Sequence, residues 1–404
     1  MEGSDHRVSP FSRFARIALV VPVVLVGLFV ALPTVVALRH GFAVTKVFTD
    51  EQMREVLWFT VWQAVVSTLF TTVLGVPVAW LLSRQEFAGR RAIRALTLVP
   101  FVLPTVVVGL AFRALFPGEL RTGIAPLIIA HVFLNVAVVV RIVGVRWEMQ
   151  PFGFEEAAAT LGAPPFRRFT TVTWPMLRGA IVAAAGLVFM YCFTTFGAAR
   201  VLAGPTHPTT ETEIYRLAVF TGDDRSAAAL AMVQILFVGV VLAATSGRGS
   251  RGIAPALPRQ LRLSPRRTRI GVTAGATAIA AFFALPLVGL VLRSVHLGHG
   301  VSISAWRAAF RDDSASANVV SALASSLRVA LVAAIIATAA GVLLSFARVH
   351  AQRAQERLIA VACELLPVVV SAVVLGLGFI LAFRNDPFDW RGTWWILPVA
   401  HAVV

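Results

Sequence analysis

The charged residues that are best spaced to act together lie in one polar stretch, residues 155–175, between long apolar segments. Two adjacent carboxylates, Glu155 and Glu156, come first, and the basic pair Arg167 and Arg168 follows. Carboxylates suit the positive end of a helix dipole, and a glycine such as Gly162 ends a helix in a left-handed conformation. We therefore predict two short helices joined by a tight turn, which form a rigid helix–turn–helix, with an ordinary amphipathic interfacial loop as the alternative.

No comparable set of residues indicates an enzyme active site. A phosphate-binding loop needs a lysine after Gly-x4-Gly, whereas the single lysine, Lys46, lies between Thr45 and Val47. Histidine and glutamate do not recur at metal-binding spacing, and no Ser–His–Asp arrangement is evident. Cys192 and Cys363 both lie in apolar segments and predict no disulfide framework. We therefore expect no catalytic residues, no metal, no cofactor and no ATP hydrolysis by this chain.

The composition is that of a membrane protein. Hydrophobic residues make up 58% and charged residues 14% of the chain, and the mean hydropathy is +0.81. A soluble domain carries about a quarter charged residues, and a spanning helix needs about 20 apolar residues. We predict an all-α, polytopic membrane helix bundle whose tenth span begins near Thr393 after nine complete ones. The nine are 17–38, 57–82, 95–116, 124–143, 179–202, 227–245, 270–292, 321–346 and 358–383.

The net charge is +16, and most of the basic residues lie in loops between these spans. Alternate loops hold 22 of the 36 basic residues, at 7–16, 84–94, 141–178, 248–269 and 348–357. Cytoplasmic loops carry such an excess of Lys and Arg, so we expect a cytoplasmic N-terminus in a cell inner membrane. Basic clusters beside spans orient helices or contact anionic membrane lipid, which argues against nucleic-acid binding.

The chain contains an internal duplication. Residues 99–112 align with 366–379 at an offset of 267, and three shorter matches keep the same order: 31–33 with 284–286, 75 with 341, and 130–131 with 400–401. Six spans per complete copy predict a parallel repeat, with its pseudo-twofold axis along the membrane normal. The second copy reaches Val404 before its own polar loop, which the offset places near residue 426. We interpret the second copy as incomplete, either through truncation or as a natural fragment.

The polar stretch resembles the EAA loop of permease subunits in binding-protein-dependent ABC importers. That pattern is Glu-Ala-Ala, three residues, Gly, nine residues, then Ile-x-Leu-Pro, and the residues that match it are Glu156, Ala157, Ala158, Gly162 and Pro175. Val172 and Trp174 replace the Ile and the Leu. The resemblance implies a type I importer permease whose loop couples to cytoplasmic ATP-binding subunits. It also implies an extracytoplasmic solute-binding protein as a partner.

Five further stretches resemble thiamine-importer permeases, with iron(III) permeases as related alternatives. They are 58–64, 100–104, 130–135, 189–196 and 209–215, and residues 202–205 depart from the usual longer glycine run. The expected domains are a helix and outer loop (1–56), a first permease core (57–245) with its loop at 151–175, a cytoplasmic linker (246–269), a helix and outer loop (270–320), and a partial second core (321–404). A secondary transporter is a weaker alternative, since it leaves the polar loop unexplained.

Five residues within the spans are candidates for the substrate pathway: Trp62, Gln63, Asn135, Phe193 and Glu364. Polar groups inside a membrane are functional candidates by default, and ring faces attract a cationic solute such as thiamine. Each candidate has a packing alternative. Gln63 and Asn135 would then hydrogen-bond across helices, the two aromatic rings would fill helix interfaces, and Glu364 would pair with a cation.

Overall fold

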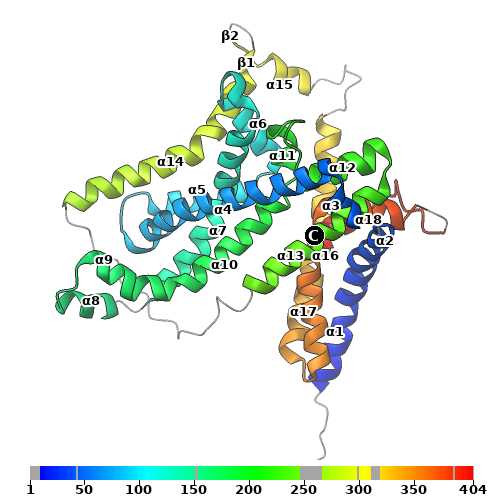
Figure 1. Ribbon diagram of the computed structural model, residues 1–404, viewed down its shortest axis with the longest axis horizontal. Coiled ribbons are helices and arrows are strands. Elements are labelled where there is room, and N and C mark those ends of the chain that lie inside the picture. The colour runs from blue at the N-terminus through cyan, green and yellow to red at the C-terminus, as the bar shows by residue number, and fades with distance from the viewer. Residues whose placement is uncertain are drawn as a thin grey trace, which may run out of the picture. The chain divides into compact units, whose positions relative to one another are not determined.

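The computed structural model describes residues 10–41, 44–150, 153–245, 266–297, 300–310, 319–384 and 387–403 (Figure 1). Pro151, the predicted start of the polar loop, and residues 246–265 of the predicted linker lie outside these ranges. The described chain is almost entirely helical. Its two short strands, β1 (His296–Leu297) and β2 (Gly300–Val301), pair antiparallel. The predicted all-α class is confirmed.

Seven helical segments in the described ranges are long and apolar enough to cross a membrane, and nine if each of two bent pairs counts as one span. The seven segments are Arg16–His40, Glu51–Arg84, Ile124–Glu148, Pro165–Phe193, Asp224–Thr245, Ile270–Val295 and Val319–His350. They correspond in order to seven of the nine predicted spans. The predicted helix at 179–202 is too long, because helix α10 (Trp174–Phe193) ends before the separate helix α11 (Gly197–Leu202).

The predicted spans at 95–116 and 358–383 are not single helices. The first divides into α5 (Arg90–Val102) and α6 (Thr105–Leu115) with a bend of 108°, and the second into α17 (Ala354–Val369) and α18 (Ala372–Ala382) with a bend of 100°. The proline after Leu103 disfavours helical dihedrals there, and Leu103 is extended with ψ 140°. At the second bend the side chain of Ser371 caps α18 by accepting from the Val374 amide.

The two bends fall at equivalent places in the two copies. Helices α6 and α18 have the same length, and their boundaries differ by the 267 positions that relate the repeated sequence. The structure therefore supports the duplication inferred from short sequence matches.

The chain divides into two compact units, and unit 2 comprises residues 51–213 and 237–302. Its centre is the packing of α4 (Glu51–Arg84) on α7 (Ile124–Glu148) and on α10. A side chain at Gly75 would bring a Cβ to 2.6 Å from that of Val139, so this glycine allows the two helices to approach closely. Helix α14 (Arg266–Val295) packs on α5 and α6. In the core, the ring centroids of Phe283 and Phe133 are 5.5 Å apart.

Unit 1 comprises residues 1–50, 214–236 and 303–404. Helix α1 (Pro10–Val26) packs on α16 (Val319–His350) and α17, and α2 (Leu32–His40) packs on α18. A Cβ at Gly378 would lie 2.6 Å from the Pro33 carbonyl oxygen, so this contact also requires a glycine. Phe29, in the π-helical turn η1 (Gly27–Ala31), lies against four rings from the second copy: Phe379, Phe383, Trp390 and Trp395.

The two copies exchange their first spans. In unit 1 the opening helices of the first copy pack on the second copy, and in unit 2 the opening helix of the second copy, α14, packs on the first. The linear order of the predicted domains does not reveal this exchange. Other elements are the membrane-length helix α13 (Asp224–Thr245) and the short elements α3 (Val44–Thr49), η2 (Gly118–Arg121), α12 (Thr210–Tyr215), η4 (Arg216–Thr221), α15 (Ser304–Ala309) and α19 (Ile396–Val403).

Candidate functional site

The polar loop begins with helix α8 (Gly153–Thr160), which ends in a glycine turn. Gly162 has φ +79°, its amide donates to the Ala159 carbonyl at 3.0 Å, and the Ala163 amide donates to the Ala158 carbonyl at 3.0 Å. This pair of bonds is the Schellman pattern, which satisfies carbonyls at the end of a helix. The prediction that Gly162 ends the helix in a left-handed conformation is confirmed.

The second predicted helix of the loop is the start of a transmembrane helix. Helix α9 (Pro165–Arg168) continues through the π-helical turn η3 (Phe169–Thr173) into α10 without a break. Pro165 occupies the first turn, where its missing N–H costs nothing. Helix α8 and its turn, residues 153–164, therefore stand on the extended end of α10, and we call them the knob.

The two adjacent glutamates of the knob face different surroundings. Glu155 accepts a 2.6 Å hydrogen bond from the Thr173 hydroxyl and lies 3.5 Å from Nη2 of Arg84, at the end of α4. The Arg84 side chain is only 7% exposed and also contacts the Gln150 side chain at 3.4 Å. Glu156 is exposed. Glu155 therefore ties the knob to α4 and η3, and Glu156 is the more exposed of the two glutamates.

A second set of ion pairs joins the helix ends next to the knob. Glu148, the last residue of α7, pairs with Arg94 and lies 3.5 Å from Nη2 of Arg90. Arg90 also donates from Nε to the Leu82 carbonyl at 2.7 Å. These contacts join the ends of α4 and α7 to the start of α5, so the knob stands on helix ends that are tied together.

The other predicted members of the coupling site lie at the surface of unit 2. Ala157, Gly162, Arg167 and Pro175 are exposed, whereas Ala158 and Arg168 are half-buried. Sequence reasoning missed the apolar side chains among them. Leu161 is 87% exposed and Phe166 is 78% exposed, on either side of the glycine turn. Large apolar residues on both sides of a glycine in a polar stretch are the sequence signal that would have pointed to them.

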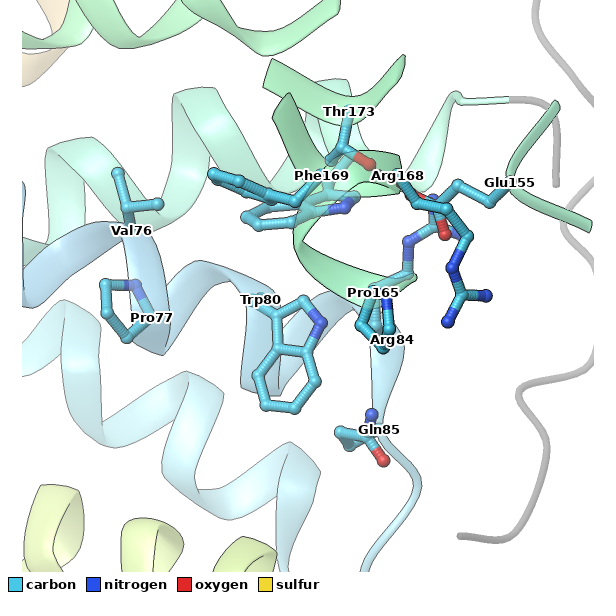
Figure 2. A pocket seen from close by; sticks show the side chains of 11 residues that line it. Val76, Pro77, Trp80, Arg84, Gln85, Glu155, Pro165, Arg168, Phe169 and Thr173 are labelled. Carbon is cyan, nitrogen blue, oxygen red and sulfur yellow. Dashed lines mark hydrogen bonds and ion pairs between the residues drawn. The ribbon is translucent and has the colours of Figure 1, made fainter. Parts of the chain in front are cut away.

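A cavity of about 670 Å³ opens beside the knob, between the end of α4 and η3 (Figure 2). Its lining residues are Val76, Pro77, Trp80, Arg84, Gln85, Trp147, Glu155, Pro165, Arg168, Phe169 and Thr173. Figure 2 shows aliphatic and aromatic side chains along one side and the charged groups together at the other. The cavity therefore has an apolar end and a charged end.

Two of the predicted pathway residues meet in a buried polar cluster of unit 2. Gln63 donates to the Cys192 carbonyl at 2.9 Å, and Asn135 donates to the His131 carbonyl at 2.9 Å and contacts the Cys192 sulfur at 3.5 Å. Ser67 lies 3.1 Å from Nδ1 of His131 in the same cluster. These bonds join α4, α7 and α10, which is the helix-packing alternative of the sequence analysis.

The other three candidates do not join that cluster. Phe193 is buried and stacks on Phe237 with ring centroids 5.0 Å apart. Trp62 is exposed on α4 and contacts Phe59. Glu364 belongs to unit 1, where it forms an ion pair with Arg348. The five residues therefore do not form one site within unit 2, and Glu364 has the cation partner that the sequence left as its alternative.

The family model described as "Binding-protein-dependent transport system inner membrane component" matches residues 71–250. The chain is 29% identical to the thiamine transport system permease protein ThiP of Brucella suis biovar 1 (strain 1330), over 84% of this chain and 65% of that protein. It is 32% identical to ThiP of Escherichia coli (strain K12), over 52% of this chain and 42% of that protein. It is also 35% identical to the sulfate transport system permease protein CysT of Escherichia coli (strain K12), over 43% of this chain and 67% of that protein. The chain thus spans about 65% of the length of the Brucella thiamine permease.

Proposed function

Because the chain belongs to the family of binding-protein-dependent transport system inner membrane components, we propose that it forms the membrane pathway of an ATP-driven importer. The seven apolar helices within its described ranges are those of a multi-pass membrane protein. The energy comes from separate ATP-binding subunits on the cytoplasmic side, and an extracytoplasmic solute-binding protein delivers the solute. The bent helices and the paired copies then form the moving pathway.

The coupling role belongs to the knob. Glu156 and Leu161 expose a carboxylate and an apolar side chain on the knob, and Phe166 and Arg167 are exposed directly after it in α9. Together these four residues offer a mixed surface that a groove on an ATP-binding subunit would bury. Buried apolar anchors surrounded by polar groups carry most of the energy in such interfaces. The ties from Glu155 to Thr173 and Arg84 make the knob rigid enough to transmit motion to α4 and α10.

The proposed cargo is thiamine or a thiamine-like solute. The observation that carries this proposal is the extent of similarity, because the Brucella ThiP alignment covers 84% of the chain, including much of both copies, whereas the CysT alignment covers 43%. An iron(III) cargo is the alternative from the sequence resemblance. Within the pathway, Trp62 is the exposed aromatic candidate for a cationic ring.

The proposed orientation places the N-terminus and the knob in the cytoplasm of a cell with an inner membrane. The arginine-rich loops at 84–94 and 141–178 lie on the same side as the knob in this arrangement.

Two measurements test the proposal. Co-purification of an ATP-binding subunit with the membrane-extracted protein should succeed for the wild type and weaken for Glu156→Lys, which reverses an exposed charge at the contact. Arg54→Glu, an exposed reversal at the other end of α4, is the matched control and should retain the subunit. Equal retention by both variants would contradict the coupling role. Calorimetry on the partner solute-binding protein, with thiamine and with ferric iron, tests the cargo separately.

A further inference from the structure

The cavity beside the knob has an apolar end and a charged end, which match the acyl chains and the headgroup of a membrane lipid. Val76, Pro77 and Trp80 line one end, and Arg84 and Arg168 line the other (Figure 2). At about 670 Å³ it falls within the range of roughly 300–1,000 Å³ in which proteins hold small ligands. We propose that this cavity binds the phosphate headgroup of an anionic phospholipid, whose acyl chains lie along the surface of α4.

The charges of the cavity favour an anion. Two guanidinium groups and one carboxylate, Glu155, leave a net positive charge among its lining residues. Glu155 already contacts Arg84 at 3.5 Å, so Arg168 carries the remaining charge. The Nε atom of Arg168 is buried and has no hydrogen-bond partner within the described parts of the chain. A phosphate oxygen would satisfy this donor and complement its charge.

The apolar end of the cavity continues onto the spanning surface of α4. Leu69, Val73, Val76 and Trp80 follow one another at helical spacing, and Leu69 and Val73 are 60% and 61% exposed. At about 1.5 Å per residue, the helix rises about 16 Å from Val73 to Arg84. That rise matches about half of the roughly 30 Å hydrocarbon core. Acyl chains along this stripe would therefore bring their phosphate to the two arginines.

The aromatic lining also fits a lipid better than a free anion. Trp80 is 39% exposed and lies at the level where the apolar stripe ends, and Phe169 also lines the cavity. Tryptophan side chains are enriched at this level of the bilayer, where one part of the ring is apolar and the other is wet. Basic pockets between spanning helices on the cytoplasmic side are typical sites for lipid headgroups.

The test is a lipid titration of the purified full chain, followed by native mass spectrometry. The probes are dioleoyl phosphatidylglycerol, dioleoyl phosphatidylcholine and glycerol 3-phosphate. We expect the anionic lipid to bind more tightly than the zwitterionic one, and Arg168→Gln to weaken it about fivefold, the effect of one basic residue near a membrane surface. Arg167→Gln is the matched control, because the neighbouring Arg167 is exposed and does not line the cavity, and it should change binding less than twofold.

A photoreactive acyl chain on phosphatidylglycerol supplies a second readout on the wild-type protein, independent of how any variant folds. It should label the α4 peptide that contains Val76 and Trp80. Equal losses for Arg167→Gln and Arg168→Gln, or no preference for the anionic lipid, would overturn the proposal. Full displacement by glycerol 3-phosphate would identify a site for free anions. A selective loss of the ATP-binding subunit in Arg168→Gln, without lipid selectivity, would assign the cavity to a protein interface.

These readouts need neither transport nor ATP hydrolysis. A failure of the lipid proposal would therefore leave the proposed importer function unaffected, and the lipid site could exist whichever solute is carried.

Discussion

The glycine turn of the knob is held by backbone conformation alone. Gly162 has φ +79°, and a Cβ built there would meet no atom of the described chain within 4 Å. A substitution therefore changes the backbone preference without causing a clash inside the protein. A residue with a Cβ pays about 1–2 kcal/mol in a left-handed conformation, whereas asparagine tolerates it better. Gly162→Ala should weaken the closed turn by about that amount, and Gly162→Asn by less.

Hydrogen exchange measures this difference directly. The amides of Leu161, Gly162 and Ala163 donate to the last turn of α8 at 3.0–3.1 Å, so they exchange when the turn opens. A change of 1–2 kcal/mol should make their exchange about 5–30-fold faster in Gly162→Ala. Gly162→Leu should resemble Gly162→Ala, because Gly162 is exposed and a Cβ at this position meets no atom within 4 Å. Unchanged exchange in Gly162→Ala, or equal acceleration in Gly162→Asn, would refute the argument.

The remaining predictions concern the knob, the orientation and Asp223. Glu155→Gln should accelerate exchange in α8 about fivefold, because it removes the partner charge of a buried arginine in a pair that is partly screened by solvent; no change would mean that the pair does not restrain the knob. Leu120→Cys should react with an impermeant reagent in intact cells and Leu161→Cys only after permeabilisation, and the reverse pattern would invert the topology. A hydrogen bond from the Ser226 hydroxyl, with help from other partners, holds the pKa of Asp223 below its usual value. The stabilising effect of the ionised Asp223 carboxylate should therefore persist above about pH 4 and disappear as the pH falls through the lowered pKa. In thermal melts over that acid range, Asp223→Asn should therefore lose less stability than the wild type.

The location and ends of the knob could be predicted from local sequence rules. Gly162 ends α8 as expected, because glycine, which has no Cβ, adopts the left-handed conformation without a steric penalty. The different roles of Glu155 and Glu156 could not be predicted. Adjacent residues point about 100° apart on a helix, and the one that faces the protein depends on where Arg84 and Thr173 lie.

Hydropathy located the membrane segments but did not show their continuity. The spans predicted at 95–116 and 358–383 each contain a sharp bend, because Leu103 and Val370 leave the helical region while their neighbours remain apolar. The proline after Leu103 was a visible signal for the first bend. The second bend has Ser371 at the corresponding position, and a lone serine in an apolar run is too common to predict one.

The helical class, the membrane location, the repeat and the place of the polar loop could all be predicted from the amino-acid sequence. These features follow from the composition, from the lengths of the apolar segments, from matching segments of sequence and from residues with special backbone preferences. Each of them can be recognised without knowing which distant residues are in contact. The folded protein was needed to show that the first span of each copy packs on the other copy, that Gln63 and Asn135 hydrogen-bond within the helix bundle, and that Glu155 faces inward. Such choices depend on contacts between residues far apart in sequence, and many apolar helix faces of similar composition could have made them.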